Sequence, residues 1–136
     1  MTDAAGVPLV ARCGPANRHD SIGFEALLDA VPPVRTPAGR RRFRPGKLHA
    51  DKGYDIPRCR AALRQRRIGD RIARVGVEPR HRLGRRRWVV EQTLALLKQF
   101  RRLAVRHERK EEHYQAFLTL GCCVFCLRRL WTTPRL

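Results

Sequence analysis

The sequence predicts an α/β layered domain in which helices cover a sheet. Short apolar segments typical of strands alternate along the chain with segments of helical periodicity. Two long stretches of helical periodicity then close the chain, over about 85–104 and 111–130. At 136 residues the chain has the length of one domain and can bury a core.

The elements before residue 46 are expected in the order strand, helix, loop. The strand is expected over Val7–Arg12 after a turn at 3–6. The helix is expected over Ser21–Val31, with Ser21 as its N-cap, and the Pro32–Pro33 pair ends it. The stretch Thr36–Gly46, with two more prolines and a basic run, is expected to be a loop.

The centre of the chain is expected to form a strand, a helix and a second strand. Lys47–Asp51 has the character of a short strand that Gly53 closes, and Asp70–Val75 of another. Between them a helix is expected from Pro57 to about Arg67, with Asp55 as its N-cap.

The charge is strongly positive and unevenly distributed. Lysine and arginine number 30 against 12 acidic residues, a net charge of +18, and residues 40–110 hold 24 of the basic and six of the acidic ones. Most of these cations are arginines, whose planar fork matches phosphate oxygens in pairs. The composition therefore favours a nucleic acid as partner over the alternative of a merely solvated surface.

The helix over 85–104 carries one carboxylate on a basic face. At 100° per residue, Glu91 falls on the same side as Arg87, Lys98 and Arg102, and the apolar residues fall opposite. Taken alone, this pattern is that of an ordinary surface ion pair.

Two motifs in order give this carboxylate a context. The first is His49-Ala-Asp51-Lys-Gly-Tyr-Asp55, and the second is Arg87-x3-Glu91-x6-Lys98, followed by Gln99-Phe-Arg-Arg-Leu103. This series resembles the C-terminal part of insertion-sequence transposases of the DDE type, in the IS-four/IS-five group, except that Gly84 stands where that signature has a tyrosine. The resemblance extends over nearly the whole of residues 1–136.

The resemblance implies a partial RNase H-like domain: an incomplete mixed sheet flanked by helices, with two C-terminal helices. It implies DNA transposition, with transposon ends and target DNA as partners, and two Mg2+ (or Mn2+) ions that assist phosphodiester cleavage and strand transfer. Asp51 and Glu91 would be two of the three catalytic, metal-holding carboxylates. The expected DNA-binding residues are Arg87 and Lys98, with Arg85, Arg86 and Arg102 beside them.

The same resemblance implies that residues 1–136 lack the first catalytic aspartate, its strand and the N-terminal DNA-binding region of the family, and that Asp3 is not the missing ligand. Three readings stay open: a decayed remnant, one half of a frameshifted product, or a chain that pairs with another transposase chain. The isolated chain is expected to bind DNA without cutting it. The alternatives are a non-enzymatic basic DNA-binding module and an RNA-binding protein, which the 7% aromatic content disfavours.

Other features indicate the location of the protein and minor candidate sites. The start of the chain lacks the pattern of a signal peptide, and the apolar stretch Ala116–Leu127 is too short for a membrane span, so a cytoplasmic protein without a membrane partner is expected. The odd cysteine count is typical of free thiols, and a zinc site at Cys122, Cys123, Cys126 and His113 is disfavoured. His19–Asp20 is explained equally well as a catalytic pair or as part of a polar loop, whereas structural roles are favoured for His49 and Tyr54.

Overall fold

The computed structural model describes residues 1–15, 17–77 and 80–132, except for the side chains of residues 80–87. The chain divides into two compact units, each described here by itself. Unit 1 consists of residues 1–13 and 88–136, and unit 2 of residues 14–87. The described residues form helices and two small two-stranded sheets, which confirms a mixed α/β class.

The centre of unit 2 is a strand–helix–strand segment. The strands β3 (Lys47–Ala50) and β4 (Gly69–Ile72) are parallel, in a register from Lys47↔Gly69 to Ala50↔Ile72, and α2 (Pro57–Gln65) connects them. Pro57 is tolerated because the first turn of a helix leaves its N–H groups without intrahelical acceptors. Gly69 is required by close approach, because a Cβ at this position would lie 3.0 Å from the Gly46 carbonyl oxygen. The predicted order of strand, helix and strand is confirmed.

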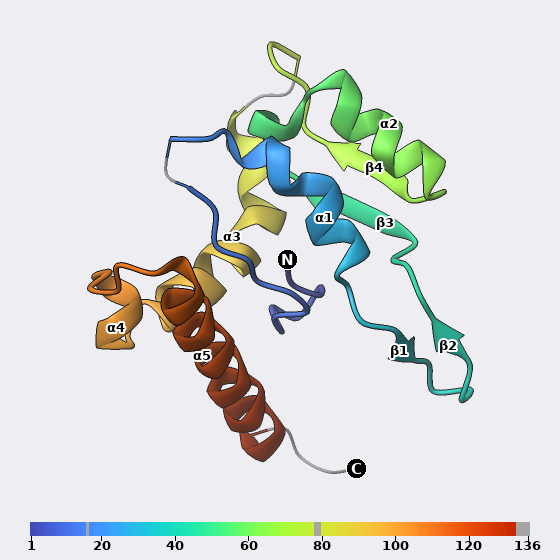
Figure 1. Cartoon of the computed structure of the whole chain (residues 1–136). Helices are drawn as coiled ribbons and strands as arrows, with labels where there is room; N and C mark the ends of the chain where they lie inside the picture. The colour runs from blue at the N-terminus through green and yellow to red at the C-terminus, as the bar shows by residue number, and fades with distance from the viewer. Residues whose placement is uncertain (16, 78–79, 133–136) are drawn as a thin grey trace. The chain divides into compact units, whose positions relative to one another are not determined.

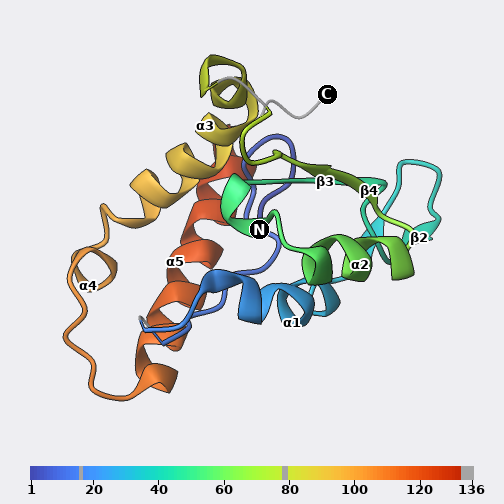
Figure 2. The same cartoon turned by 90° about the horizontal axis from the view of Figure 1, so that it is seen from above.

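Two helices cover one face of this strand pair. The helices α1 (Phe24–Asp29) and α2 lie on the same side of β3 and β4 (Figure 2). Between the layers lies an apolar core that consists of Phe24, Leu28, Leu48, Cys59, Ala62, Leu63, Ile68, Ile72 and Ala73. Burying these side chains is the main term that stabilises the unit.

A short antiparallel hairpin lies where a loop was expected. It pairs β1 (Val34–Arg35) with β2 (Arg41–Arg42), and Gly39 in its turn has a φ of +75°, which favours glycine. The prediction of an irregular loop over Thr36–Gly46 is wrong at β2. Because both residues of each strand are exposed, the sequence here lacks the alternation of apolar and polar residues that predicts a strand.

Three further expectations in the first half of the chain are wrong. Residues 7–12 form no strand; a single bridge, Thr2↔Pro8, closes a tight turn in which the Asp3 carboxylate accepts bonds from two backbone N–H groups. Ser21 does not cap a helix, because a 3-10 turn, η1 (Asp20–Gly23), precedes α1 and His19 caps that turn. The third is Asp55, whose carboxylate is held by Arg60 instead of capping α2.

The helix expected over 85–104, most of which belongs to unit 1, is divided in two. The helix α3 (Arg80–Leu97) ends before Phe100, whose backbone is extended, and α4 (Arg101–Ala104) follows. The reason lies on α5 (Glu111–Thr132), where a Cβ at Gly121 would be 2.8 Å from Leu103 and 3.3 Å from Leu97. On a straight helix these two leucines would be separated by about 9 Å along the axis. The break lets both pack on one glycine.

The N-terminal segment and the terminal helix belong to the same unit. The side-chain amide of Gln115 on α5 accepts a bond from the Cys13 N–H and donates one to the Ala11 carbonyl, at 2.8 and 3.0 Å. The hydroxyl of Thr93 on α3 donates to the Gly6 carbonyl at 2.8 Å. Figure 1 shows α4 beside the first turns of α5. The predicted terminal helix over 111–130 is confirmed.

No helix in the described ranges is both long and apolar enough to cross a membrane.

Candidate metal and DNA-phosphate site

Asp51 lies directly after the carboxyl end of β3 and begins a tight turn. Its side chain accepts a hydrogen bond of 2.7 Å from the Lys52 N–H and caps the 3-10 turn η2 (Lys52–Tyr54). Its carbonyl oxygen accepts a second bond, of 3.0 Å, from the Tyr54 N–H. The carboxylate is half-buried and held at a strand end, where side chains are well placed for a ligand because the sheet positions them.

Tyr54 fixes this turn to α1. Its ring packs on Phe24 with centroids 5.4 Å apart, and burial, followed by the charges of Asp20, Cys59 and Asp51, raises the pKa of its hydroxyl. The carboxyl groups of Asp20 and Asp51 therefore act on the same phenol. The interpretation of Tyr54 as a packing residue is confirmed by this contact.

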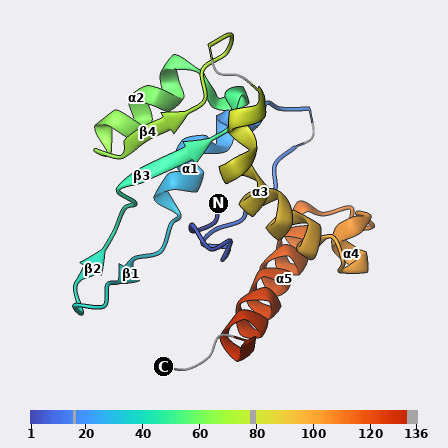
Figure 3. The same cartoon turned by 180° about the vertical axis from the view of Figure 1, so that it is seen from behind.

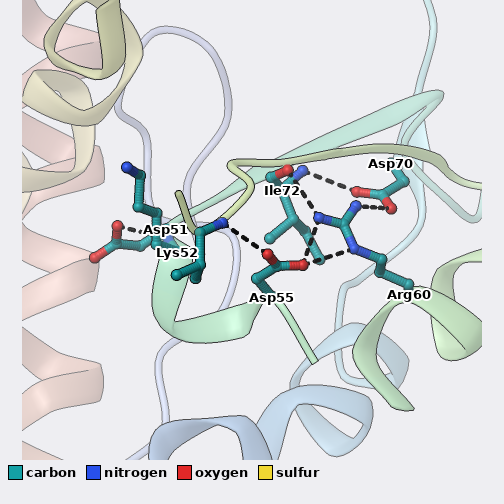
Figure 4. A network of polar contacts seen from close by, with 7 residues as sticks. Asp51, Lys52, Asp55, Arg60, Asp70 and Ile72 are labelled. Carbon is teal, nitrogen blue, oxygen red and sulfur yellow. Dashed lines mark hydrogen bonds and ion pairs between the residues drawn. The ribbon is translucent and has the colours of Figure 1, made fainter. Parts of the chain in front are cut away.

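Four residues after Asp51, an arginine-centred network joins the turn to β4 (Figure 4). The Arg60 guanidinium donates to Asp55 from Nε and Nη2, at 2.9 and 2.7 Å, and to Asp70 from Nη1. It also donates to the Ile72 carbonyl at 3.2 Å, and the Val75 N–H donates to Asp55 at 2.8 Å. The Val75 bond and Arg60 together hold the pKa of Asp55 below its usual range, whereas the Asp55 carboxylate raises the pKa of Arg60.

The sequence did not predict this network. Asp55 and Arg60 are five residues apart, which is not a helical pairing distance, and Asp70 lies on another element. The available signal was the presence of two acidic residues, Asp55 and Asp70, inside the most basic part of the chain. In so basic a segment, a carboxylate is expected to pair with a cation in the folded state.

Glu91 lies on the exposed side of α3, in unit 1. Thr93 and Leu97 are buried on the other side of the helix, whereas Glu91 and Lys98 are exposed. The Lys98 N–H still bonds to the Leu94 carbonyl at 2.9 Å, so the helical register extends to Lys98. Seven residues of this register place Glu91 and Lys98 about 20° apart around the helix and about 10 Å apart along it. The shared face predicted for them is confirmed.

Arg102 does not share that face. It lies on α4, beyond the extended Phe100, so its predicted place beside Glu91 on one helix is wrong. Its guanidinium donates to Glu108 at 2.9 Å and lies over the Phe117 ring, 5.4 Å from the centroid. Arg102 therefore has partners within its own unit.

The remaining site predictions concern three arginines and the convergence of the two carboxylates. The side chains of Arg85, Arg86 and Arg87 lie outside the described residues. Asp51 and Glu91 belong to different units, and their convergence on shared ions stays a prediction. Among the residues whose side chains are described, no three His, Cys, Asp or Glu side chains gather as a metal-holding group.

The minor candidates have structural contacts. Nδ1 of His19 is bound to the Ser21 hydroxyl at 2.8 Å, and His49 is exposed on the side of β3 opposite the buried Leu48. The five cysteines form no disulfide, and burial raises the thiol pKa of Cys122 and Cys126. A raised pKa keeps these thiols neutral, as in cysteines that pack as small apolar residues.

Comparison with known proteins connects these motifs to one family. The family model described as "Transposase DDE domain" matches residues 1–127. A curated protein of Burkholderia cepacia, "Putative transposase for insertion sequence element IS402", is 46% identical over 135 residues. The aligned region covers 99% of this chain and 62% of that relative, so the chain spans less than two thirds of its length. No solved structure matches the chain significantly.

Proposed function

Because the chain belongs to the transposase DDE domain family, we propose that it takes part in DNA transposition as the portion of a catalytic domain that carries Asp51 and Glu91. The fold we propose for the complete domain is RNase H-like. The strand–helix–strand segment of unit 2, with Asp51 directly after β3, supports this assignment. The partner is DNA, both the transposon ends and the target.

The observation that carries the proposal is the placement of the two carboxylates. Asp51 is held after a strand end by the turn that Tyr54 and Arg60 stabilise, and Glu91 lies on the outer face of a helix whose other face is packed. Carboxylate oxygens are the ligands that Mg2+ and Mn2+ prefer. We propose that Asp51 and Glu91 are two of the three carboxylates that hold the divalent ions.

The roles of the residues follow from their chemistry. Bound divalent ions would stabilise the charge on the entering and leaving oxygens of the phosphodiester. Asp51 and Glu91 hold these ions, and Lys98, on the face of Glu91, binds a phosphate and orients the DNA strand beside them. We propose that residues 1–136, as an isolated chain, bind DNA without cleaving it.

The convergence of the two carboxylates is tested by iron-mediated cleavage of the polypeptide. Fe2+ takes the place of Mg2+, and ascorbate with peroxide then produces radicals that cut the backbone near the bound ion. We expect cuts close to both residue 51 and residue 91 of the full chain, and excess Mg2+ should suppress them. Asp51→Asn should remove the cuts near residue 91 as well as those near residue 51.

The matched control is Asp29→Asn, because Asp29 is an exposed carboxylate already paired with Arg66 at 2.7 Å. This variant should retain both sets of cuts. Cuts at one carboxylate only, or cuts that Asp51→Asn leaves unchanged near residue 91, would refute the shared site.

The second candidate is a basic DNA-binding module without catalytic ions, which the net charge of +18 favours. The two candidate functions predict different effects of replacing the Glu91 carboxylate. For the module, Glu91→Gln leaves DNA binding unchanged or tighter and indifferent to Mg2+. For the transposase portion, wild-type DNA binding responds to Mg2+ and Glu91→Gln abolishes that response. Nicking of DNA by the purified chain, abolished by Asp51→Asn, would overturn the proposed inactivity of the isolated chain.

A further inference from the structure

The β1–β2 hairpin is the most basic element of unit 2 outside the proposed site. From Val34 to Gly46 the chain contains five arginines and no acidic residue: Arg35, Arg40, Arg41, Arg42 and Arg44. All five are exposed. In Figure 3 the hairpin extends beyond β3, away from α1 and α2 of the same unit.

Two of these arginines are directly opposite each other. The register pairs Arg35 with Arg41 across the two strands, so their side chains leave the same face of the hairpin. Residues opposite each other in an antiparallel pair have Cβ atoms about 4.5–5.5 Å apart, and like charges at that separation are destabilising. Among the described residues, no carboxylate pairs with either arginine. The repulsion is relieved when an anion binds between the two guanidinium groups.

The neighbouring arginines behave differently. Arg44 donates to the Arg66 carbonyl at 2.9 Å, and the Arg42 guanidinium lies 3.3 Å from the point where Gly46 would carry a Cβ. The Arg44 side chain therefore has a backbone partner outside the hairpin, and the Arg42 side chain lies close to the backbone at Gly46. Phe43, between them in sequence, is 69% exposed. Arg35, Arg40 and Arg41 are therefore the cations of the hairpin that are left for an external anion, and the register places Arg35 and Arg41 opposite each other.

We propose that the β1–β2 hairpin binds duplex DNA, with the Arg35–Arg41 pair on backbone phosphates. A two-stranded ribbon has the width that the major groove admits, and arginine binds phosphate oxygens through two parallel hydrogen bonds. Such contacts position a duplex without reading its sequence. This inference rests on the proposed function only in that DNA is the partner, and it assigns the contact to an element outside both carboxylate motifs.

The test is a salt titration of DNA binding by the full chain. A fluorescein-labelled 20-base-pair duplex is titrated with wild type and with Arg35→Gln/Arg41→Gln, and anisotropy is measured across a series of NaCl concentrations. We expect the variant to bind at least tenfold more weakly at low salt. The slope of log K against log salt should become shallower by about 1.8, because each lost phosphate contact removes about 0.9.

Two further variants make the result specific. Arg18→Gln/Arg109→Gln removes the same charge from two other exposed positions and should change the slope by less than about 0.5. Arg35→Lys/Arg41→Lys keeps the charge and should restore most of the slope. Because the glutamine variant relieves a like-charge pair, its thermal stability without DNA should equal or exceed that of wild type.

The possible outcomes distinguish a failure of the hairpin inference from a failure of the proposed function. If wild type binds DNA and the hairpin variant matches its charge control, the hairpin inference is wrong and the proposed function stands. If the hairpin variant unfolds at a lower temperature than wild type, the like-charge argument is wrong. If wild type does not bind the duplex at any salt concentration, both the function and the inference fail.

Discussion

The Arg60 guanidinium donates two hydrogen bonds to one oxygen of Asp55, at 2.9 and 2.7 Å. Through Asp70 and the Ile72 carbonyl, the same guanidinium is fastened to β4. The turn that begins at Asp51 is therefore tied to β4 by one side chain.

Asp55→Asn should destabilise the chain at neutral pH more than at acid pH. The pKa of Asp55 is lowered in the folded state, so its contribution is fully present above the ordinary carboxyl pKa of about 3.9 and is lost as pH falls through the lower folded value. Urea unfolding at pH 7 and pH 3 checks this. Asp20→Asn, at an exposed carboxyl on η1, is the control. An equal loss at both pH values would contradict the charge-based account.

Thr93→Val should cost about 1–3 kcal/mol of unfolding free energy. The substitution keeps the shape of the side chain but removes the donor to the Gly6 carbonyl, which then lacks a partner at a buried position. Chemical denaturation measures the difference. The same change at the exposed Thr119 of α5 should alter the stability by less than about 0.5 kcal/mol. Equal effects at the two positions would show that the Gly6 bond contributes nothing.

Gly121→Ala should destabilise unit 1 although alanine favours helices. The added methyl group would lie 2.8 Å from Leu103, and overpacking of this kind costs about 1–3 kcal/mol against about 1 kcal/mol of helix propensity. Thermal unfolding followed by circular dichroism measures the net loss. Gly23→Ala, where no atom lies within 4 Å of the new Cβ, should be neutral. A Gly121→Ala protein more stable than wild type would contradict the close packing of α5 on Leu103.

Lys98→Gln and Arg102→Gln should affect DNA binding unequally, although each removes one positive charge. Lys98 lies on the face of Glu91, whereas Arg102 is held by Glu108 and Phe117. Loss of one phosphate contact at Lys98 should reduce the slope of log K against log salt by about 0.9. Anisotropy with a labelled duplex measures both variants. A larger change for Arg102→Gln would place the DNA on the face of α4.

The strands, helices and motifs with strong periodic or turn signals could be predicted from the sequence. The strand at Lys47, the helix that begins at Pro57 and the terminal helix at Glu111 are found where local patterns indicated them. The break after Leu97 was not predictable, because no proline or glycine marks it and its cause is Gly121 on another helix. For the same reason the prediction placed Arg102 on the wrong element.

Capping was the second source of error. Serine and aspartate are both favourable N-cap residues, so Ser21 and Asp55 were expected to cap helices. In the structure His19 caps the 3-10 turn before α1, and Arg60 holds the Asp55 carboxylate. In each case a tertiary or neighbouring contact outweighed a local preference of about 1 kcal/mol. The motifs around Asp51 and Glu91 indicated the family, and comparison confirmed it.

The two hydrogen bonds of the Gln115 side chain have a consequence for the order of folding during synthesis. Gln115 binds Cys13 and Ala11, which precede it by 102 and 104 residues. The ribosome must synthesise the 102 residues that follow Cys13 before its backbone N–H can meet the Gln115 side chain. Residues 14–87 emerge in between and can form their own contacts first, so unit 2 should fold before the contacts of Gln115 in unit 1 form.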